Sequence, residues 1–156
     1  MLPRSHAQET ATRICVVQVK EGFEGTSTVQ ESGADAIGLT SELSTRKTKN
    51  GLLVPAILLF RMPRKEVDSE VDMQQCGYVV ELWRHISADD AGTGGAYPVE
   101  PSGDRDMVEY QLRKAGSRKV LASGAAPPLI VHGPAHWVSP SPYPLIATSI
   151  MKKINP

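Results

Sequence analysis

The sequence predicts an α+β fold in which a mainly antiparallel β-sheet of about five to six strands is followed by one or two C-terminal helices. Short β-branched segments, one starting at Arg13 and one covering residues 75–86, are typical of strands. The pair Asn50-Gly51 between two strand-like segments is a strong hairpin signal, because both residues tolerate the positive φ of a type I′ turn. The best helical pattern begins only later, at Asp104.

The first hairpin is predicted near the N-terminus. Arg13 to Lys20 is short and β-branched, which favours a strand. Gly22 and Gly25 supply a turn, and Thr26 to Glu31 returns as a second strand.

The second hairpin is predicted from residues 37–45 and 52–62, joined by the basic turn that ends in Asn50-Gly51. Pro55 has no backbone N–H to donate, so its end of the strand is expected to be an edge, a bulge or unpaired.

The segment after this hairpin is ambiguous until residue 75. Residues 64–75 alternate charged and apolar side chains, which fits either a strand edge or an exposed loop. Gln75 to Ile86 is predicted to be a strand with alternating faces. Tyr78, Val80 and Leu82 would share one face, and Val79, Glu81 and Trp83 the other.

The C-terminal part is predicted to be helical and then extended. Residues 88–103 are rich in Gly, Ala, Asp and Pro and indicate a loop. Within the helical region 104–123, Asp104 caps a helix that Gly116 stops. Residues 124–156 form a Pro-rich arm, in which residues 145–154 make a short terminal helix. Its prolines are Pro127, Pro128, Pro134, Pro140, Pro142 and Pro144.

Composition indicates one domain. The 156 residues, 40% hydrophobic and 22% charged, fit a single globular unit with an N-terminal extension over 1–12 and a sheet over 13–87. The apolar run from Leu52 to Phe60 is too short to span a bilayer. Residues 1–13 lack the apolar core of a secretory signal, so neither a membrane span nor secretion is expected.

Charge is uneven along a chain whose formal net charge is zero. From Tyr110 to Pro156 there is no acidic residue, and the basic residues are Arg113, Lys114, Arg118, Lys119, Lys152 and Lys153. This segment either gathers into a basic patch or merely solvates a surface, and the sequence leaves both open.

Residues capable of catalysis do not form a recognisable pattern. Cys15 and Cys76 lie in apolar strand-like segments, which favours buried reduced thiols in a reducing compartment. His132 and His136 are separated by Gly133-Pro134, which prevents the helix that would present both to a metal. No nucleophile elbow or Walker motif is present. We expect no enzyme activity, cofactor, metal or small-molecule substrate.

The order of these segments resembles the coat proteins of small single-stranded RNA bacteriophages, of levivirus type. The residues that carry the resemblance are the turn Arg46-Lys-Thr-Lys-Asn-Gly51, the strand that Pro63 closes, and Tyr78-Val-Val-Glu-Leu82 in the place of a Tyr-x-x-x-Glu/Asp strand. They lie within residues 13 to 87, and a helix adds to the likeness.

The resemblance implies a homodimer that assembles into an icosahedral capsid in the host bacterial cytoplasm, resides in the virion, and packages single-stranded RNA on its sheet face. The implied RNA-binding residues are Ser44, Arg46, Lys47, Lys49, Arg61 and Tyr78. The chain departs from the family at residues 57–60, which are apolar where polar RNA contacts are expected, and at Glu42. The alternative is a β-rich decoration or interaction module that binds a protein through its C-terminal arm without RNA.

Overall fold

The computed structural model describes residues 12–20, 33–86, 106–126 and 141–154. Within them, five strands form one sheet in the order β2-β1-β3-β4-β5. The strands are β1 (Ile14–Gln18), β2 (Ala56–Leu58), β3 (Tyr78–Ile86), β4 (Asp106–Lys114) and β5 (Val120–Ala126). β1 pairs in parallel with β2 and β3, while β4 is antiparallel to both β3 and β5. The α+β class is confirmed, but the sheet is mixed because crossover segments join β1, β2 and β3.

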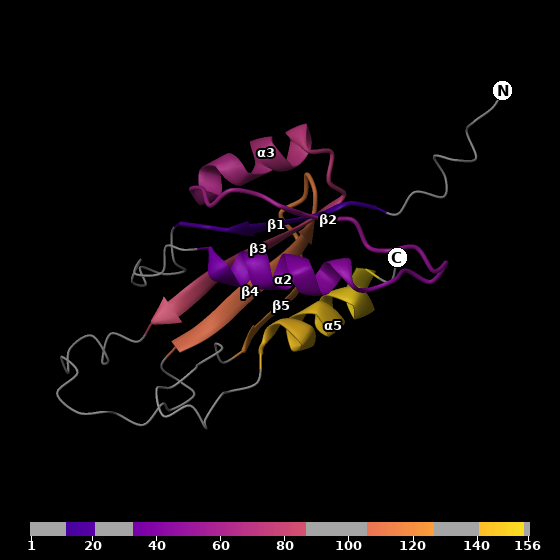
Figure 1. The fold of residues 1–156 in the computed structure, drawn as a ribbon. Coiled ribbons are helices and arrows are strands. Elements are labelled where there is room, and N and C mark those ends of the chain that lie inside the picture. Colours follow the sequence, from indigo (N-terminus) through magenta and orange to yellow (C-terminus); the bar gives the residue numbers. More distant parts are fainter. Residues whose placement is uncertain (1–11, 21–32, 87–105, 127–140, 155–156) are drawn as a thin grey trace, which may run out of the picture.

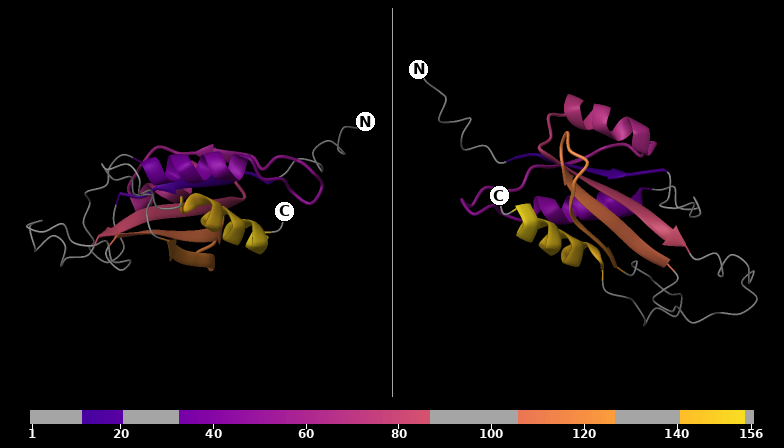
Figure 2. Two further views of the ribbon diagram at one scale, coloured as in Figure 1. Left: turned by 60° about the horizontal axis from the view of Figure 1, so that its bottom comes forward. Right: turned by 180° about the vertical axis from the view of Figure 1, so that it is seen from behind.

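Helices cover both faces of this sheet (Figure 1). They are α2 (Ala34–Ser44), α3 (Val67–Met73), which follows the 3₁₀ turn η1 (Arg64–Glu66), and α5 (Tyr143–Ile154). α2 and α5 pack side by side on one face, and α5 also contacts the outer strand β5 (Figure 2). None of the described helices is long and apolar enough to cross a bilayer.

The core consists of two layers, one on each side of the sheet. Val16, Val80 and Leu82 belong to the layer beneath α2 and α5, while Val17 and Val79 belong to the layer beneath α3. Since successive strand residues point to opposite faces, β1 and β3 contribute to both layers. The predicted faces of residues 78–83 are therefore confirmed.

The predicted second hairpin is wrong in its first strand. Residues 37–45 fall largely in α2, because Ala36, Leu39 and Leu43 repeat at helical spacing and bury one face. The turn at Asn50-Gly51 does form, with Gly51 at φ 82°. It leads from the helix into the short strand β2 instead of joining two long strands.

Two further segments differ from the sequence prediction. Residues 64–75 contain η1 and α3 and are neither an edge strand nor a loop. Val67 and Val71 are four positions apart, so a helix buries both on one face. The predicted helical region 104–123 is also wrong: Asp106–Lys114 is β4, and residues 120–123 belong to β5. Val108, Tyr110 and Leu112, which alternate along β4, enter the core.

The terminal helix predicted over 145–154 is confirmed as α5, and β1 and β3 confirm two of the predicted strands. Residues 124–126, assigned to the Pro-rich arm, belong to β5. The rest of the arm through residue 140, the N-terminal extension through residue 11, the strand predicted over 26–31 and the loop over 88–103 lie outside the described residues.

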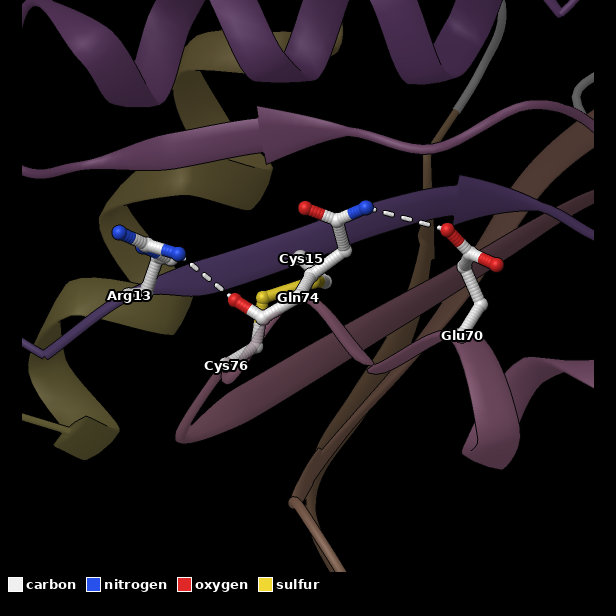
Figure 3. Close-up of a disulfide and its surroundings, with 5 residues drawn as sticks. All are labelled: Arg13, Cys15, Glu70, Gln74 and Cys76. Carbon is white, nitrogen blue, oxygen red and sulfur yellow. Dashed lines mark hydrogen bonds between the residues drawn. A yellow bond between two sulfur atoms is a disulfide. The ribbon is translucent and has the colours of Figure 1, made fainter. Parts of the chain in front are cut away.

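The expectation of two reduced thiols is wrong. Cys15 and Cys76 form a disulfide, with their Cα atoms 5.8 Å apart (Figure 3). The chain brings them together where Gly77 enters the sheet and its N–H donates to the carbonyl of Arg13 at 2.9 Å. The Arg13 guanidinium also donates to the carbonyl of Gln74 at 2.7 Å, so the bridge lies within a hydrogen-bonded junction between β1 and the segment after α3.

Candidate functional site

The predicted RNA-binding residues are divided between separate places. Ser44, Arg46, Lys47 and Lys49 follow one another at the C-terminal end of α2 and in the next turn. The Ser44 hydroxyl donates to the carbonyl of Thr40 at 2.8 Å. Lys47 and Lys49 are exposed.

Arg46 has protein partners. Its guanidinium pairs with Glu42 at 3.1 Å and donates to the carbonyl of Pro144 at 3.2 Å and the hydroxyl of Thr148 at 3.1 Å. These contacts tie α2 to α5. They occupy a side chain that the resemblance assigns to phosphate.

Arg61 and Tyr78 lie apart from that basic turn. Arg61 follows the C-terminal end of β2, whereas the turn precedes its N-terminal end. Tyr78 packs against the core layer beneath α2 and α5. The structure therefore does not join these six residues into one surface, and RNA contact stays a prediction.

A buried ion-pair network links β3, β4 and α3. Glu81 is 2% exposed and lies 2.9 Å from the guanidinium of Arg113, which also lies 2.9 Å from Asp68. Arg64 adds a pair to Glu81 at 3.7 Å and lies over the ring of Trp83. Burial alone disfavours the charged form of Arg113, but the hydrogen bonds that Arg113 donates to Glu81 and Asp68 outweigh burial and raise the pKa of Arg113.

A second network joins α2, β3 and α5. The carboxylate of Asp35, 2% exposed, accepts a hydrogen bond from Arg84 at 2.8 Å and one from the Tyr143 hydroxyl at 2.7 Å. Burial, and then this bond to Asp35, raise the pKa of Tyr143. A Cβ at Gly38 would collide with the Tyr143 ring, so a glycine lets the two helices approach.

Both networks neutralise their carboxylates with arginine and connect packed elements. In the described parts of the chain, no group of three or more His, Cys, Asp or Glu side chains is arranged to hold a metal. These networks stabilise the fold.

The sheet ends at β5, whose outer side has no neighbouring strand among the described residues. The direction of its backbone groups follows from the ladder. The carbonyl of Leu82 accepts from Val19, directly after β1, and the carbonyl of Gly77 accepts from Ala115, directly after β4. Even-numbered residues of β3 therefore bond to β1, and odd-numbered residues bond to β4.

The register carries this alternation across to β5. Because odd-numbered residues of β4 bond to β3, its even-numbered residues bond to β5, where Tyr110 lies opposite Gly124 and Leu112 opposite Ala122. The residues between them, Ser123 and Ala125, direct their N–H and C=O groups away from the sheet.

The side chains of β5 leave this edge accessible. The strand reads Val-Leu-Ala-Ser-Gly-Ala-Ala and holds no charged residue and no proline. Natural sheets usually protect an edge with charges, proline, a bulge or a covering segment. Here the register does shift by one residue near Arg113, at the start of β5, but Ser123 to Ala125 beyond it are exposed.

The close packing of Tyr110 explains why one position of β5 is a glycine. Gly124 lies across from Tyr110, and a Cβ there would be 3.1 Å from Cε1 of the tyrosine. The ring of Tyr110, 6% exposed overall, therefore packs beneath the strand where a larger residue would press on it.

A groove runs between β5 and α5. It consists of two adjoining cavities of about 470 and 250 Å³ that share Tyr110, Ser123 and Ser149. Apart from Ser123 and Ser149, the smaller one is lined by glycine and apolar or aromatic residues, among them Leu145, which is 67% exposed. The larger one ends at Val120, Lys152 and Lys153.

The basic segment of the sequence thus forms a spatial cluster in part. Lys152 and Lys153 share the groove with Val120, and Lys119 precedes Val120 directly. All three lysines are exposed. Lys152 and Lys153 line the groove, and we call these two residues its basic end. Arg113, in contrast, is buried in the Glu81 network.

Sequence reasoning missed this groove because residues 104–123 were assigned to a helix. The available signal was the absence of acidic residues after Tyr110. It did not reveal that α5 returns to the edge of the sheet.

No protein-family model matches the chain, and no curated protein matches it. Among solved structures, it is similar to the PelC dodecamer from Paraburkholderia phytofirmans and to a single-residue variant of that dodecamer. Each comparison has a TM-score of 0.43 and 14% sequence identity, and covers 93% of this chain and 88% of the PelC chain. This similarity is too low to carry an argument about function.

Proposed function

We propose that this protein is a non-catalytic binding module that accepts an extended segment of a partner polypeptide as an additional strand on β5. The observation that carries the proposal is the outward direction of the backbone groups of Ser123 and Ala125 on an edge without charge or proline. Strand addition uses such edges, with main-chain hydrogen bonds giving affinity and neighbouring pockets giving specificity.

The edge of β5 would supply affinity, and the groove beside it would supply specificity. Ser123 and Ala125 each offer one N–H donor and one C=O acceptor, and each hydrogen bond contributes roughly 0.5–1.5 kcal/mol net. Side chains of the added strand would reach the groove beside α5, where Leu145 offers an apolar contact. This proposal keeps the interaction-module alternative from the sequence and moves its binding surface from the Pro-rich arm to β5.

Capsid assembly and RNA packaging remain predictions with less support. The resemblance to phage coat proteins depends on a strand before the Asn50-Gly51 turn, and α2 occupies that segment. One face of the sheet is covered by α2 and α5, and Arg46 is paired with Glu42.

The compartment belongs to the proposal as well. Buried disulfides persist in oxidising environments and are rare where thiols are kept reduced. The bond between Cys15 and Cys76 therefore supports a protein that acts in an oxidising compartment, in place of the reducing one expected from the sequence.

The test uses substitutions at one edge position. Ser123→Pro removes an N–H that faces outward and leaves the β4 ladder intact, whereas Ser123→Ala removes only the hydroxyl. Linear peptides are selected from a random displayed library on the wild-type protein, and their dissociation constants are measured for all three proteins. We expect equal binding to wild type and Ser123→Ala, and binding weakened about tenfold or more by Ser123→Pro, a loss of about 1.4 kcal/mol.

Hydrogen exchange adds an independent readout. A bound strand protects the amides of Ser123 and Ala125, which the ladder leaves facing outward. Peptides that bind Ser123→Pro as tightly as wild type, or that leave these two amides unprotected, would show that binding does not occur by strand addition. Circular dichroism establishes that each variant is folded.

A further inference from the structure

The two ends of the groove differ chemically, and the difference specifies a ligand. We propose that the segment bound on β5 is acidic where it passes Val120 and apolar where it passes Ala126. This inference rests on the proposed function and names the partner's chemistry. This acidic and apolar pattern would let the groove select one class of peptide among extended peptides.

The acidic requirement comes from the basic end of the groove. Lys152 and Lys153 line it together with Val120, Leu121 and Ala122, and both lysines are exposed. No acidic residue is among the described residues that line this cavity. A carboxylate placed there meets cations without a competing protein carboxylate, which favours its association electrostatically.

The position of Lys152 and Lys153 also stabilises α5. Lysines in the last turn of a helix interact favourably with the negative end of its dipole, and both lie in the last turn of α5. Lys119 precedes Val120 directly but is not among the residues that line the groove. The two exposed lysines of α5 are therefore the cations that a ligand in the groove would meet.

The apolar requirement comes from the opposite end. There the groove is lined by Ala126, Leu145 and Ile146 and by no charged residue among those described. Leu145 is 67% exposed, so a hydrophobic side chain of the ligand would cover it.

The length of β5 sets the spacing of these two features. Val120 and Ala126 are six positions apart, and a strand rises about 3.3 Å per residue, so the two ends are separated by about 20 Å. The ligand is thus a peptide whose acidic and apolar side chains lie about five to six residues apart. Either strand direction satisfies this spacing.

The experiment sequences the peptides selected on the wild-type protein and measures their binding by fluorescence anisotropy at low and high salt. The double variant Lys152→Ala/Lys153→Ala removes the basic end. The matched control, Lys47→Ala/Lys49→Ala, removes the same charge from exposed lysines in the turn before β2. Ser123→Pro is measured alongside them.

We expect selected peptides to be enriched in Asp and Glu relative to the library, with an apolar residue at the stated spacing. Lys152→Ala/Lys153→Ala should weaken binding about tenfold at low salt, with a smaller effect at high salt, and the control should bind as wild type. This result would support the inference.

Other outcomes overturn it in distinguishable ways. Neutral or basic peptides that lose affinity in Ser123→Pro but not in Lys152→Ala/Lys153→Ala would leave strand addition standing and remove the acidic requirement. Peptides unaffected by any variant would remove the proposed function as well. A single-stranded RNA oligonucleotide that displaces them and depends on Lys152 and Lys153, but not on Ser123, would assign the groove to nucleic acid.

Discussion

The inner and outer halves of the sheet are built differently. In the inner half, β1 lies between β2 and β3, all five of its residues are buried, and Cys15 is bridged to Cys76. In the outer half, β5 is paired on one side only, and most of its residues are at least partly exposed. Parallel strands are generally covered on both faces, whereas an antiparallel edge tolerates solvent. The difference supports the proposal that a partner binds at the outer half, while the inner half is held by burial and by the disulfide.

The largest expected effect comes from breaking the inner half. Replacing both cysteines, as Cys15→Ala/Cys76→Ala, should lower the free energy of unfolding by about 4 kcal/mol, because the bridge closes a loop with a sequence separation of 61 residues. Urea unfolding measures it. Reduction of the wild-type protein is the control and should give a similar loss. Equal stability of the oxidised and reduced proteins would mean that the inner half does not depend on the bridge.

The next effect tests the connection between the halves. Glu81→Ala should cost about 3 kcal/mol, because it removes the ion pair between β3 and β4 and leaves the buried guanidinium of Arg113 paired with the partly exposed Asp68 of α3. Asp72→Ala, which removes an exposed carboxylate from α3, should change stability by less than about 0.5 kcal/mol. Similar losses in both variants would argue against a role for the buried network.

A pair of prolines sharpens the comparison within β5 itself. Ala122→Pro removes an N–H that bonds to β4 and should cost about 2 kcal/mol. Ser123→Pro removes one that faces outward and should cost less than about 0.5 kcal/mol. Thermal and urea unfolding compare the two. A greater loss for Ser123→Pro would reverse the inferred direction of the backbone groups.

The smallest expected loss of stability concerns α5, which forms one wall of the groove. Tyr143→Phe removes the hydrogen bond to Asp35 and should cost about 1 kcal/mol near neutral pH. Since burial and then this bond raise the pKa of Tyr143 in the folded state, the stabilisation is present below the unfolded pKa of about 10 and is lost as the pH rises through the folded value. Urea unfolding of both proteins on either side of pH 10 should show their difference shrinking at the higher pH. A constant difference would exclude this linkage.

The sequence predicted the elements whose patterns were locally unambiguous. β1 and β3 were visible as β-branched or alternating segments, and α5 was visible as an apolar stretch between proline and basic residues. The segments that were predicted wrongly fit both a helical and a strand pattern. In β4, Val108 and Leu112 fit both a helix and a strand.

Tertiary contacts decided between those patterns. At the end of a helix, Arg113 would interact favourably with the negative end of the dipole, but in β4 it donates a hydrogen bond to Glu81 on the neighbouring strand. The disulfide and the groove depend in the same way on which strands become neighbours. The basic residues near the C-terminus were readable in the sequence, whereas the position of Lys152 beside Val120 requires the packing of α5 on β5.

The bond between Cys15 and Cys76 also changes the chain from a line into a ring with two tails. The ring includes α2, β2 and α3, while β3, β4, β5 and α5 belong to the C-terminal tail. A protease that cuts once within the ring therefore leaves a single covalent molecule until a reductant is added. A single cut in either tail gives two separate chains under denaturing conditions even without reductant, so denaturing electrophoresis with and without reductant reports whether the cut lies inside or outside the ring.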